Sequence, residues 1–561
     1  MANSLVFKDY IVFIFYFIVV ACYGYWIYNR KKKASTDTKD FFLAEGSLTW
    51  WAIGASLIAS NISAEQFVGM SGDGYFIGIG IAVYEWLAAL SLVIIAVWFI
   101  PVYLKNKIYT MPQFLTRRYN ETVALIMAVF WLFLYVFVNL TSILYLGSVA
   151  INGLAGGQYL HIIMIGLAVF ALIITLGGMK VIGYTDVIQV AVLIIGGIAT
   201  TYLALSIVGE RLGGGSSVIE GFKTLMEKAP DHFHMILPKP DETTPQVEVD
   251  KYLILPGIAM YFAGQWIVNL NYWGCNQYIT QRALGADLKT ARRGLIFASF
   301  LKLFMPVIVM LPGIAAFVLH KNGELEHLIG GKDGAYSAIL AFLPSGLKGL
   351  SIAALTAAIV ASLAGKANSI STIYVLDIHK KYFNKAADER KMVNIGRITV
   401  IVAMIIAIIF TWNDSLGIGG KGGFTFIQKY TGFISPGVFA MFILGMFWKR
   451  TTGAAAIAGV ITGFLLSIIF NNYAPEWFGT ETWLYTAYKN SAGIYEIPFL
   501  LSMGYSFFFT VALMVIMSLL GPKVNPKAFE HDKKMFKVEP STLALIMVIL
   551  IILSLLYVRF W

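Results

Sequence analysis

The sequence predicts an all-α polytopic membrane protein with about 14 transmembrane helices. Of its 561 residues, 58% are hydrophobic and 13% are charged, and the mean hydropathy is +0.73. Soluble domains carry about 25% charged residues, so this composition excludes a soluble globular protein. The formal net charge of +11 does not indicate a nucleic-acid partner, because the Lys and Arg residues lie between apolar segments and not on one solvated surface.

Fourteen apolar segments follow one another along the chain. Each is taken as one crossing of a hydrocarbon core that is roughly 30 Å thick. They lie near residues 9–28, 49–77, 78–104, 121–151, 158–179, 184–208, 251–280, 294–320, 346–378, 393–412, 424–448, 451–472, 497–520 and 541–558. An even number of spans places both termini on the same side of the membrane.

The basic residues of the loops predict the orientation. Loops after odd-numbered segments carry 26 of the 42 Lys and Arg residues, whereas the other loops and the termini carry 12. Because the more basic loops stay in the cytosol, both termini are predicted to be extracytoplasmic. We expect the protein in a plasma membrane, which is the inner membrane if the source is bacterial. Four basic residues remain in or at the edges of apolar segments: Lys302, Lys366, Arg397 and Lys429.

Two segments contain polar and glycine residues that predict a broken helix. The second carries the run 59–66, and the seventh carries Gly264-Gln265 and the run 269–274. The two segments lie five apart, and an odd offset reverses the direction of crossing, so segments 2–6 and 7–11 are predicted to be inverted repeats. Paired broken helices of such transporters line the binding site. A glycine-rich kink at a tight helix crossing is the alternative.

The repeats divide the chain into five predicted parts. The long charged stretch between the sixth and seventh segments separates the two repeats. The parts are a first peripheral helix with a basic cytosolic loop (1–48), the first repeat (49–208), an extracytoplasmic loop (209–250), the second repeat (251–448) and three peripheral C-terminal helices (449–561).

Glu85 and Lys302 lie inside apolar segments, roughly 10 to 12 Å deep at about 1.5 Å per residue. A lone charge at a helix centre costs about 2.5 to 3.5 kcal/mol, so such residues usually face a cavity, a ligand or each other. Amides and aromatic rings accompany them: Gln66, Asn269, Gln428, Tyr84, Tyr272 and Trp273. Groups that donate and accept suit sugar hydroxyls, and an aromatic wall suits the apolar ring face, so the set predicts a sugar site. For any one amide, an interhelical hydrogen bond is the alternative.

Sequence motifs for ATP hydrolysis or enzymatic chemistry are missing or out of context. Lys421 is followed by Gly422 and not by Ser or Thr, so the chain has no P-loop and is not expected to be an ATP-driven pump. Gly417, Gly419 and Gly422 match the dinucleotide pattern by letter, but they follow a transmembrane segment and not a strand. The seven histidines lie in loops or near segment ends. The chain is therefore not expected to be an enzyme.

A series of ordered motifs extends along nearly the whole chain. They are residues 40–44 with Trp50-Trp51, the run 59–72, Tyr84-Glu85-Trp86, residues 139–142 and 184–189, Gln277-Tyr278 with Gln281-Arg282, and residues 447–450. In these motifs the sequence resembles the solute:sodium symporters, and within that family the bacterial symporters of galactose and glucose. The resemblance implies a five-plus-five inverted-repeat core of the LeuT type with extra helices, and alternating access to a central sugar.

The resemblance also implies roles for residues at matching positions. The sugar ligands would be Gln66, Glu85, Asn269, Lys302 and Gln428, with Asn61 close by. The outer gate would be Met70, Tyr84 and Phe424, and the inner gate Tyr272 stacked on the sugar ring, with Trp273 behind it. Sodium would be held by the backbone carbonyls of Ala59, Ile62 and Ala358 and by the hydroxyl of Ser362.

Three positions depart from the family pattern. Ala88 stands where the bacterial members have a Ser that contacts the sugar, and Asn271 stands where they have a second Tyr. These differences are expected to change affinity or hexose preference. Ala361 replaces the first of two consecutive serines, so one hydroxyl ligand of sodium is missing.

Asp186 and Lys366 are assigned to the ion path. Asp186 matches a family acid near the exit route of the ion, and a cap at the start of a cytosolic helix is the alternative. Lys366 follows Ser362 by one helical turn and shares its face, so its ammonium is expected to occupy or crowd the sodium site. The alternative is a side chain that reaches cytosolic water or pairs with an acid such as Asp186.

The sequence thus predicts a secondary active transporter that takes up galactose or glucose with Na⁺. Its expected partners are the sugar and the lipid bilayer, and the oligomeric state is left open. One alternative keeps the fold but carries another polyol such as inositol, or an acid such as sialate or proline, although Glu85 argues against an anion. A proton-coupled or uncoupled sugar transporter is a second alternative, because Ala361 and Lys366 alter the sodium site. A sugar sensor with a transporter-like fold is a third.

Overall fold

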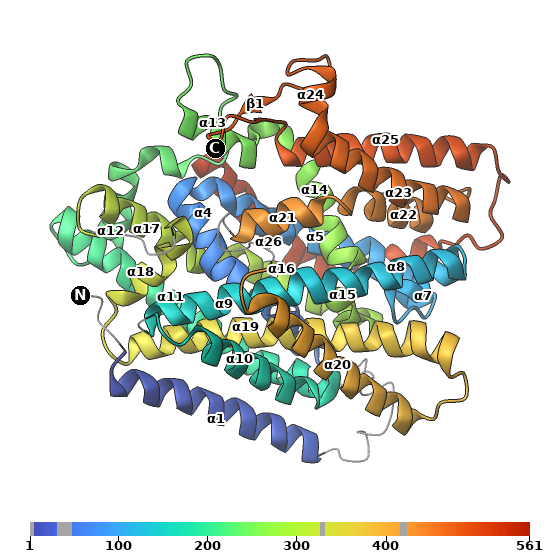
Figure 1. Cartoon of the computed structure of the whole chain (residues 1–561), viewed down its shortest axis with the longest axis horizontal. Helices are drawn as coiled ribbons and strands as arrows, with labels where there is room; N and C mark the ends of the chain where they lie inside the picture. Colours follow the sequence, from blue (N-terminus) through green and yellow to red (C-terminus); the bar gives the residue numbers. More distant parts are fainter. Residues whose placement is uncertain (1–4, 31–47, 156, 326–330, 416–422) are drawn as a thin grey trace. The chain divides into compact units, whose positions relative to one another are not determined.

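The computed structural model describes residues 5–30, 48–155, 157–325, 331–415 and 423–561 (Figure 1). In these residues the chain forms helices and one two-stranded sheet, and it divides into two compact units. Unit 1 comprises Met1–Ile79, Met127–Phe233 and Gln277–Phe426, and unit 2 comprises Gly80–Ile126, His234–Asn276 and Ile427–Trp561. The motif at 40–44 and the glycines at 417, 419 and 422 lie outside the described residues.

Ten helical stretches of the described chain are long and apolar enough to cross a membrane. They are Phe7–Ile27, Ile79–Lys105, Glu121–Leu154, Gly178–Gly213, Leu288–Lys321, Leu347–Phe383, Glu389–Thr411, Gly453–Phe478, Phe499–Leu519 and Pro540–Phe560. The bent pair Gln246–Phe262 and Gly264–Cys275 makes an eleventh if it is one span. Each of these eleven matches a predicted segment. Of the remaining three segments, the fifth holds a 16-residue helix, and the second and eleventh divide into shorter helices.

Unit 1 is organised around one long buried helix, α19 (Leu347–Thr372). Figure 1 shows α1 (Phe7–Arg30) lying along α19, which also contacts α10, α11 and α20. The many Ala, Ser and Gly residues of α19 let neighbouring helices approach closely. The other principal helices of this unit are α3 (Trp50–Asn61), α4 (Ser71–Phe76), α9 (Thr141–Leu154), α10 (Leu160–Thr175), α11 (Gly178–Val208), α12 (Val218–Lys228), α15 (Gln277–Leu284), α16 (Leu288–Val309), α17 (Leu311–Lys321), α18 (Ala335–Ala341) and α20 (Glu389–Thr411).

Two glycines bring α3 and α16 close together. A Cβ atom on Gly54 would lie 2.7 Å from the carbonyl oxygen of Gly294, so a methyl group there would force the helices apart. About two turns further along both helices, Asn61 contacts Lys302. The two helices therefore run in the same direction, as alternation requires of the second and eighth segments.

The predicted break in the second segment is confirmed. α3 ends at Asn61, Ile62 is extended (φ −80°, ψ 115°), and the chain resumes as the π-helix η2 (Glu65–Met70). The backbone N–H of Ser63 donates to Oε1 of Gln66 at 2.9 Å. In an uninterrupted α-helix it would bond to the carbonyl of Ala59, four residues back. The Gln66 side chain thus terminates α3 and leaves the Ala59 carbonyl outside the helical ladder.

The predicted break in the seventh segment is confirmed, and it lies at the first of the two places that the sequence indicated, Gly264-Gln265. An 81° bend precedes α14 (Gly264–Cys275), and the helix ends where Asn276 is extended (φ −94°, ψ 128°). The second place, the run 269–274, is helical and carries no break. Nδ2 of Asn269 donates to the carbonyl oxygen of Gln265, one turn back, at 3.0 Å. This polar side chain is therefore satisfied without unwinding the helix.

Unit 2 places α14 against α5 (Val83–Ile94), α22 (Ser435–Phe447) and α25 (Phe499–Leu519). Arg118 stabilises the end of α22, because its guanidinium donates to the carbonyl oxygens of Gly445, Trp448 and Thr451 at 2.6 to 3.0 Å. The remaining helices of this unit include α6 (Ile100–Lys105), α7 (Met111–Arg118), α13 (Gln246–Ile254), α23 (Gly453–Ile468), α24 (Ala474–Phe478) and α26 (Pro540–Phe560). Two helices, α8 (Glu121–Phe133) and α21 (Gly423–Gly432), contribute residues to both units.

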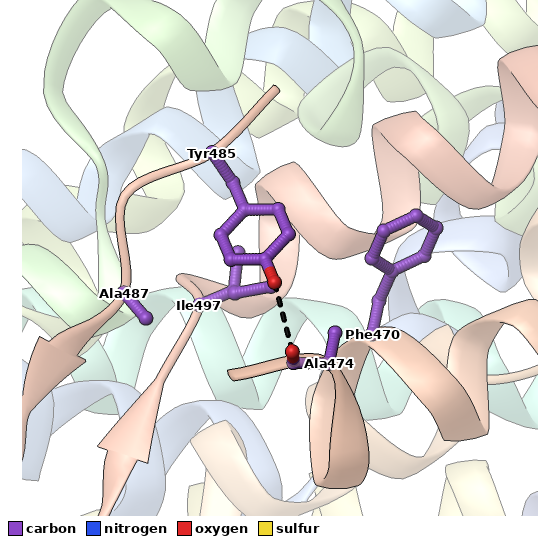
Figure 2. Close-up of a cluster of buried hydrophobic side chains, with 5 residues drawn as sticks. All are labelled: Phe470, Ala474, Tyr485, Ala487 and Ile497. Carbon is purple, nitrogen blue, oxygen red and sulfur yellow. Dashed lines mark hydrogen bonds between the residues drawn. The ribbon is translucent and has the colours of Figure 1, made fainter. Parts of the chain in front are cut away.

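A small hairpin between α24 and α25 has its own core. Its strands, β1 (Tyr488–Lys489) and β2 (Tyr495–Glu496), are antiparallel. Figure 2 shows the cluster of buried side chains at its base, where the hydroxyl of Tyr485 donates to the carbonyl oxygen of Ala474 at 2.8 Å. The cluster consists of Phe470, Ala474, Tyr485, Ala487 and Ile497.

The stretch 209–250, predicted as a loop, contains α12 and the start of α13. Within unit 2, α13 supports the hairpin, since Nε2 of Gln246 donates to the carbonyl oxygen of Lys489 at 2.8 Å. The ammonium of Lys429 on α21 also reaches the hairpin, where it lies 3.3 Å from a carboxylate oxygen of Glu496. This ion pair explains the basic residue at the edge of the eleventh segment.

Candidate functional site

The break in the second segment carries a buried polar pair in unit 1. Nζ of Lys302, on α16, donates a hydrogen bond to Oδ1 of Asn61 at the end of α3. Lys302 is fully buried and Asn61 is 7% exposed. A buried ammonium and a buried amide at a helix break place polar groups inside an apolar segment, where such residues usually serve a ligand or each other.

Gln66 lies on the other side of the same break. Its Oε1 accepts from both the backbone N–H and the hydroxyl of Ser63, at 2.9 and 3.2 Å. These two hydrogen bonds occupy the side-chain oxygen of Gln66 and stabilise the interruption between α3 and η2. The amide nitrogen has no partner among the described residues, and its two N–H groups suit a hydroxyl acceptor.

The other three predicted sugar ligands belong to unit 2. Glu85 is near the start of α5 and only 3% exposed, and Asn269 is buried on α14, which packs against α5. Gln428 is half-buried on α21. The predicted ligand set is thus divided equally between the two units.

The predicted gate residues show the same division. In unit 1, a Cβ atom on Gly69 would lie 2.7 Å from the backbone nitrogen of Phe424. The backbone at the start of α21 is therefore in close contact with η2. Met70 and Phe424 are both buried there. In unit 2, Tyr84 is buried on α5, and the rings of Tyr272 and Trp273 on α14 are 5.2 Å apart in an edge-to-face arrangement. Asn271, which replaces a family tyrosine, donates to the hydroxyl of Ser435 on α22 at 3.1 Å.

Asp73 is a structural residue that the sequence reasoning missed. Its carboxylate is buried, lies 2.5 Å from the ammonium of Lys332 and accepts a hydrogen bond from Thr425 at 3.0 Å. It thereby joins α4 to the segment before α18 and to the start of α21, beside Phe424. A carboxylate within the second apolar segment is the signal that would have found it.

The predicted sodium ligands are gathered in unit 1. Ala59, Ile62, Ala358 and Ser362 are all buried, and α3 packs against α19. The hydroxyl of Ser362 donates to the carbonyl oxygen of Ser60 at 3.0 Å, which brings it to the end of α3. Carbonyl and hydroxyl oxygens at a helix break suit a hard cation such as Na⁺. The residues present therefore fit a cation, with the Ala59 carbonyl released from the helical ladder and Ala361 contributing no hydroxyl.

Lys366 faces a carboxylate and an aromatic ring. It is 3% exposed, its ammonium interacts electrostatically with Glu65 on η2, and its Nζ lies 5.0 Å from the centroid of the Tyr278 ring. The alternative that the side chain pairs with an acid is supported, although the acid is Glu65 and not Asp186, whereas the low exposure contradicts a side chain that reaches cytosolic water. Glu65, which the sequence reasoning did not single out, is the counter-charge.

Asp186 lies inside α11, so the alternative that it caps the start of a helix is wrong. Its carboxylate accepts from the hydroxyl of Ser56 at 2.5 Å and lies 3.8 Å from the guanidinium of Arg282. Arg282 in turn donates to Ser56 at 2.7 Å and to the hydroxyl of Ser60. This buried network fixes the end of α3 next to the predicted sodium ligands.

The model of the sodium:solute symporter family matches residues 41–463. The chain belongs to this family. The expected class, a multi-pass membrane transporter of the solute:sodium symporters, is therefore confirmed. The break at Ile62 is an interrupted helix of the kind that occurs in transporters with inverted repeats.

Relatives of known name cover most or all of the chain. It is 41% identical over 576 residues to the sodium/glucose cotransporter of Vibrio parahaemolyticus, with 100% of the chain and 99% of the relative covered. It is 32% identical to sodium/myo-inositol cotransporter 2 of Mus musculus, with 82% of the chain and 69% of the relative covered. It is 30% identical to sodium/glucose cotransporter 1 of Ovis aries, with 82% and 71% covered.

The fold of this sodium:solute symporter also matches a solved structure, the substrate-bound outward-open state of a Na⁺-coupled sialic acid symporter. The TM-score is 0.76 at 21% sequence identity, and 93% of this chain and 99% of that chain are covered. The similarity supports the transporter fold.

Proposed function

We propose that the protein takes up a hexose, galactose or glucose, by alternating access coupled to Na⁺. The observation that carries the proposal is the buried Asn61–Lys302 pair at the break of the second segment. Such a polar pair inside an apolar segment, next to unwound backbone, is the type of place at which transporters with broken helices bind a polar solute. The similarity along the whole chain to a sodium/glucose cotransporter supports a sugar as that solute.

The proposed site uses both kinds of group that a sugar requires. Asn61, Gln66, Asn269 and Gln428 donate and accept, Lys302 donates, and Glu85 accepts, so sugar hydroxyls find partners of either type. Tyr272 offers an aromatic face to the apolar side of the ring. By the family resemblance, Met70, Tyr84 and Phe424 are assigned to the outer gate, and Tyr272 and Trp273 to the inner gate. A carboxylate in the site disfavours an anionic solute, because Glu85 would repel it.

Sodium is proposed to bind to the carbonyls of Ala59, Ile62 and Ala358 and to the hydroxyl of Ser362. Two unit charges about 4 Å apart repel by about 4 kcal/mol at an effective dielectric of 20, so the ammonium of Lys366 opposes a second cation. The carboxylate of Glu65 offsets part of this repulsion. With one hydroxyl ligand missing at Ala361, we expect Na⁺ to bind with low affinity and still to drive uptake.

The proposed topology has fourteen spans with both termini extracytoplasmic and repeats at 49–208 and 251–448. The remaining proposed parts are 1–48, 209–250 and 449–561. The common direction of α3 and α16 supports the alternation on which this topology rests. In this arrangement Asp186 and Lys366 face the cytosolic route of the ion.

A second candidate solute is a polyol such as myo-inositol. The observation that favours it is the 32% identity to a sodium/myo-inositol cotransporter, together with the loss of a sugar-site hydroxyl at Ala88 and a ring at Asn271. With one aromatic ring fewer at Asn271, the proposed site is expected to distinguish less strongly between a hexose and a cyclic polyol.

The test is uptake of a radiolabelled panel into proteoliposomes with and without an inward Na⁺ gradient. The panel contains galactose, glucose, myo-inositol, sialic acid and proline. We expect saturable uptake of galactose or glucose that increases with the gradient. Preference for myo-inositol would select the second candidate, and uptake of sialic acid or proline alone would contradict both.

A further inference from the structure

The surface of unit 1 contains a groove of about 340 Å³ that the transport site does not use. Four helices form it: α1, α10, the start of α11 and α20. Its floor includes the buried side chains of Val20, Phe170 and Ile174, and small residues such as Ala21 and Gly24 make the hollow. The groove opens at the surface, where Tyr25 and Ile173 on its rim are 69% and 59% exposed.

The walls of this groove are nearly all apolar. They belong to helices that cross or enter the hydrocarbon core, because α1, α11 and α20 lie in candidate spans and α10 is a shorter apolar helix. An apolar hollow on such a surface does not hold water, since its lining offers few polar partners. An empty hollow would forfeit dispersion contacts, whereas a lipid acyl chain fills it and restores them.

Among the described residues that line the groove, Arg397 is the charged one. It lies on α20, eight residues after the first residue of that helix, Glu389, and therefore about 12 Å along the axis. A guanidinium among the apolar side chains of a candidate membrane span favours a polar or anionic neighbour. Its planar set of donors matches a phosphate group with two parallel hydrogen bonds.

Charge complementarity indicates which lipids fit. The helices around the groove carry basic residues near their ends, namely Arg30 as the last residue of α1, Lys180 in α11, and Arg390 and Lys391 in α20. All three places belong to the loops richer in Lys and Arg, which are predicted to be cytosolic. Basic pockets between helices on this side of a membrane attract anionic head groups.

We propose that the groove binds one anionic phospholipid, with an acyl chain between α1, α10 and α20 and the phosphate on Arg397. The lipid would connect the peripheral helix α1 to α20. This site is independent of the solute, so the proposal does not depend on the proposed transport function.

The test counts lipids bound to the purified full-length protein by native mass spectrometry. The protein is equilibrated with mixed micelles of phosphatidylglycerol or of phosphatidylcholine with the same acyl chains. The variants are Arg397→Gln, which removes the charge, and Ala21→Phe, which fills the hollow. Matched controls are Arg559→Gln and Ala544→Phe, both at exposed positions of α26.

We expect the wild type to hold one phosphatidylglycerol with at least tenfold preference over phosphatidylcholine. Arg397→Gln should lose the preference, Ala21→Phe should lose the bound lipid, and the controls should resemble the wild type. Equal retention of both lipids by the wild type, or unchanged preference in Arg397→Gln, would overturn the proposal. If Ala21→Phe does not fold, the comparison of Arg397→Gln with Arg559→Gln decides the question alone.

Discussion

The ammonium of Lys302 donates a hydrogen bond to the side-chain oxygen of Asn61, and this bond joins α16 to the broken end of α3. Both side chains are buried in unit 1. The pair places a charge at the end of α3, next to the extended backbone of Ile62. A solute that binds there contacts a charged group and released backbone together.

Replacing Lys302 tests the role of this pair. We expect Lys302→Met to raise the KM for galactose or glucose at least tenfold, because a hydrogen bond to a charged group contributes about 1.5 to 3 kcal/mol. The measurement is uptake into proteoliposomes at several sugar concentrations. Lys489→Met on the hairpin is the matched control and should behave as the wild type. A KM unchanged in Lys302→Met would remove Lys302 from the site.

Glu85 and Gln428 test the part of the site in unit 2. Glu85→Ala or Gln428→Ala should abolish uptake at subsaturating sugar while the protein stays folded. Each change leaves a desolvated hydroxyl without its partner, which costs about 1 to 3 kcal/mol, or up to a hundredfold in affinity. Thermal unfolding checks the fold, and Gln246→Ala on α13 is the control amide. Wild-type uptake in either variant means that the site assignment is wrong.

Tyr272 separates stacking from hydrogen bonding. Tyr272→Phe keeps the ring and should retain much of the transport, whereas Tyr272→Ala should lose it, because the proposed contact is between the aromatic face and the sugar ring. Initial uptake rates of the two variants provide the comparison. Equal rates would rule out the stacking role.

Lys366 and Ala361 test the sodium site. Removing the ammonium and restoring the hydroxyl, in Lys366→Met with Ala361→Ser, should lower the Na⁺ concentration for half-maximal uptake by about tenfold, or about 1.4 kcal/mol. Glu65→Gln should raise that concentration, since it leaves the charge of Lys366 without compensation. Lys380→Met, at an exposed lysine of the same helical stretch, is the control. Steep, saturable Na⁺ dependence in the wild type that the double variant leaves unchanged would mean that Lys366 does not crowd the ion.

The sequence predicted those features that depend on local pattern. Apolar segments and the polar run 59–66 were enough to predict the helices and the first break, because an interrupted helix needs polar side chains to satisfy its backbone. The break of the seventh segment was predicted as well and lies at Gly264, whereas the polar run 269–274 stays helical. Asn269 bonds to the preceding turn of α14, so polarity there does not require unwinding.

The sequence pattern could not predict which residues of distant segments contact one another. Glu65 became the counter-charge of Lys366 only once η2 and α19 were in place, and Asp73 met Lys332 across more than two hundred residues. Neither pair has a regular spacing that a sequence pattern could reveal. The buried charges themselves were the available signal, since each must have a partner or a ligand.

The most direct measurement of the central claim, Na⁺-coupled sugar uptake, is the steady-state ratio of internal to external galactose or glucose in proteoliposomes. A membrane potential of about 100 mV contributes roughly 2.3 kcal/mol per Na⁺, and a tenfold Na⁺ gradient adds about 1.4 kcal/mol. With one Na⁺ per sugar, this free energy supports accumulation of several hundredfold. We predict a ratio far above one that returns to one when an ionophore dissipates the Na⁺ gradient and the potential. A ratio that never exceeds one at saturating Na⁺ would contradict coupled transport.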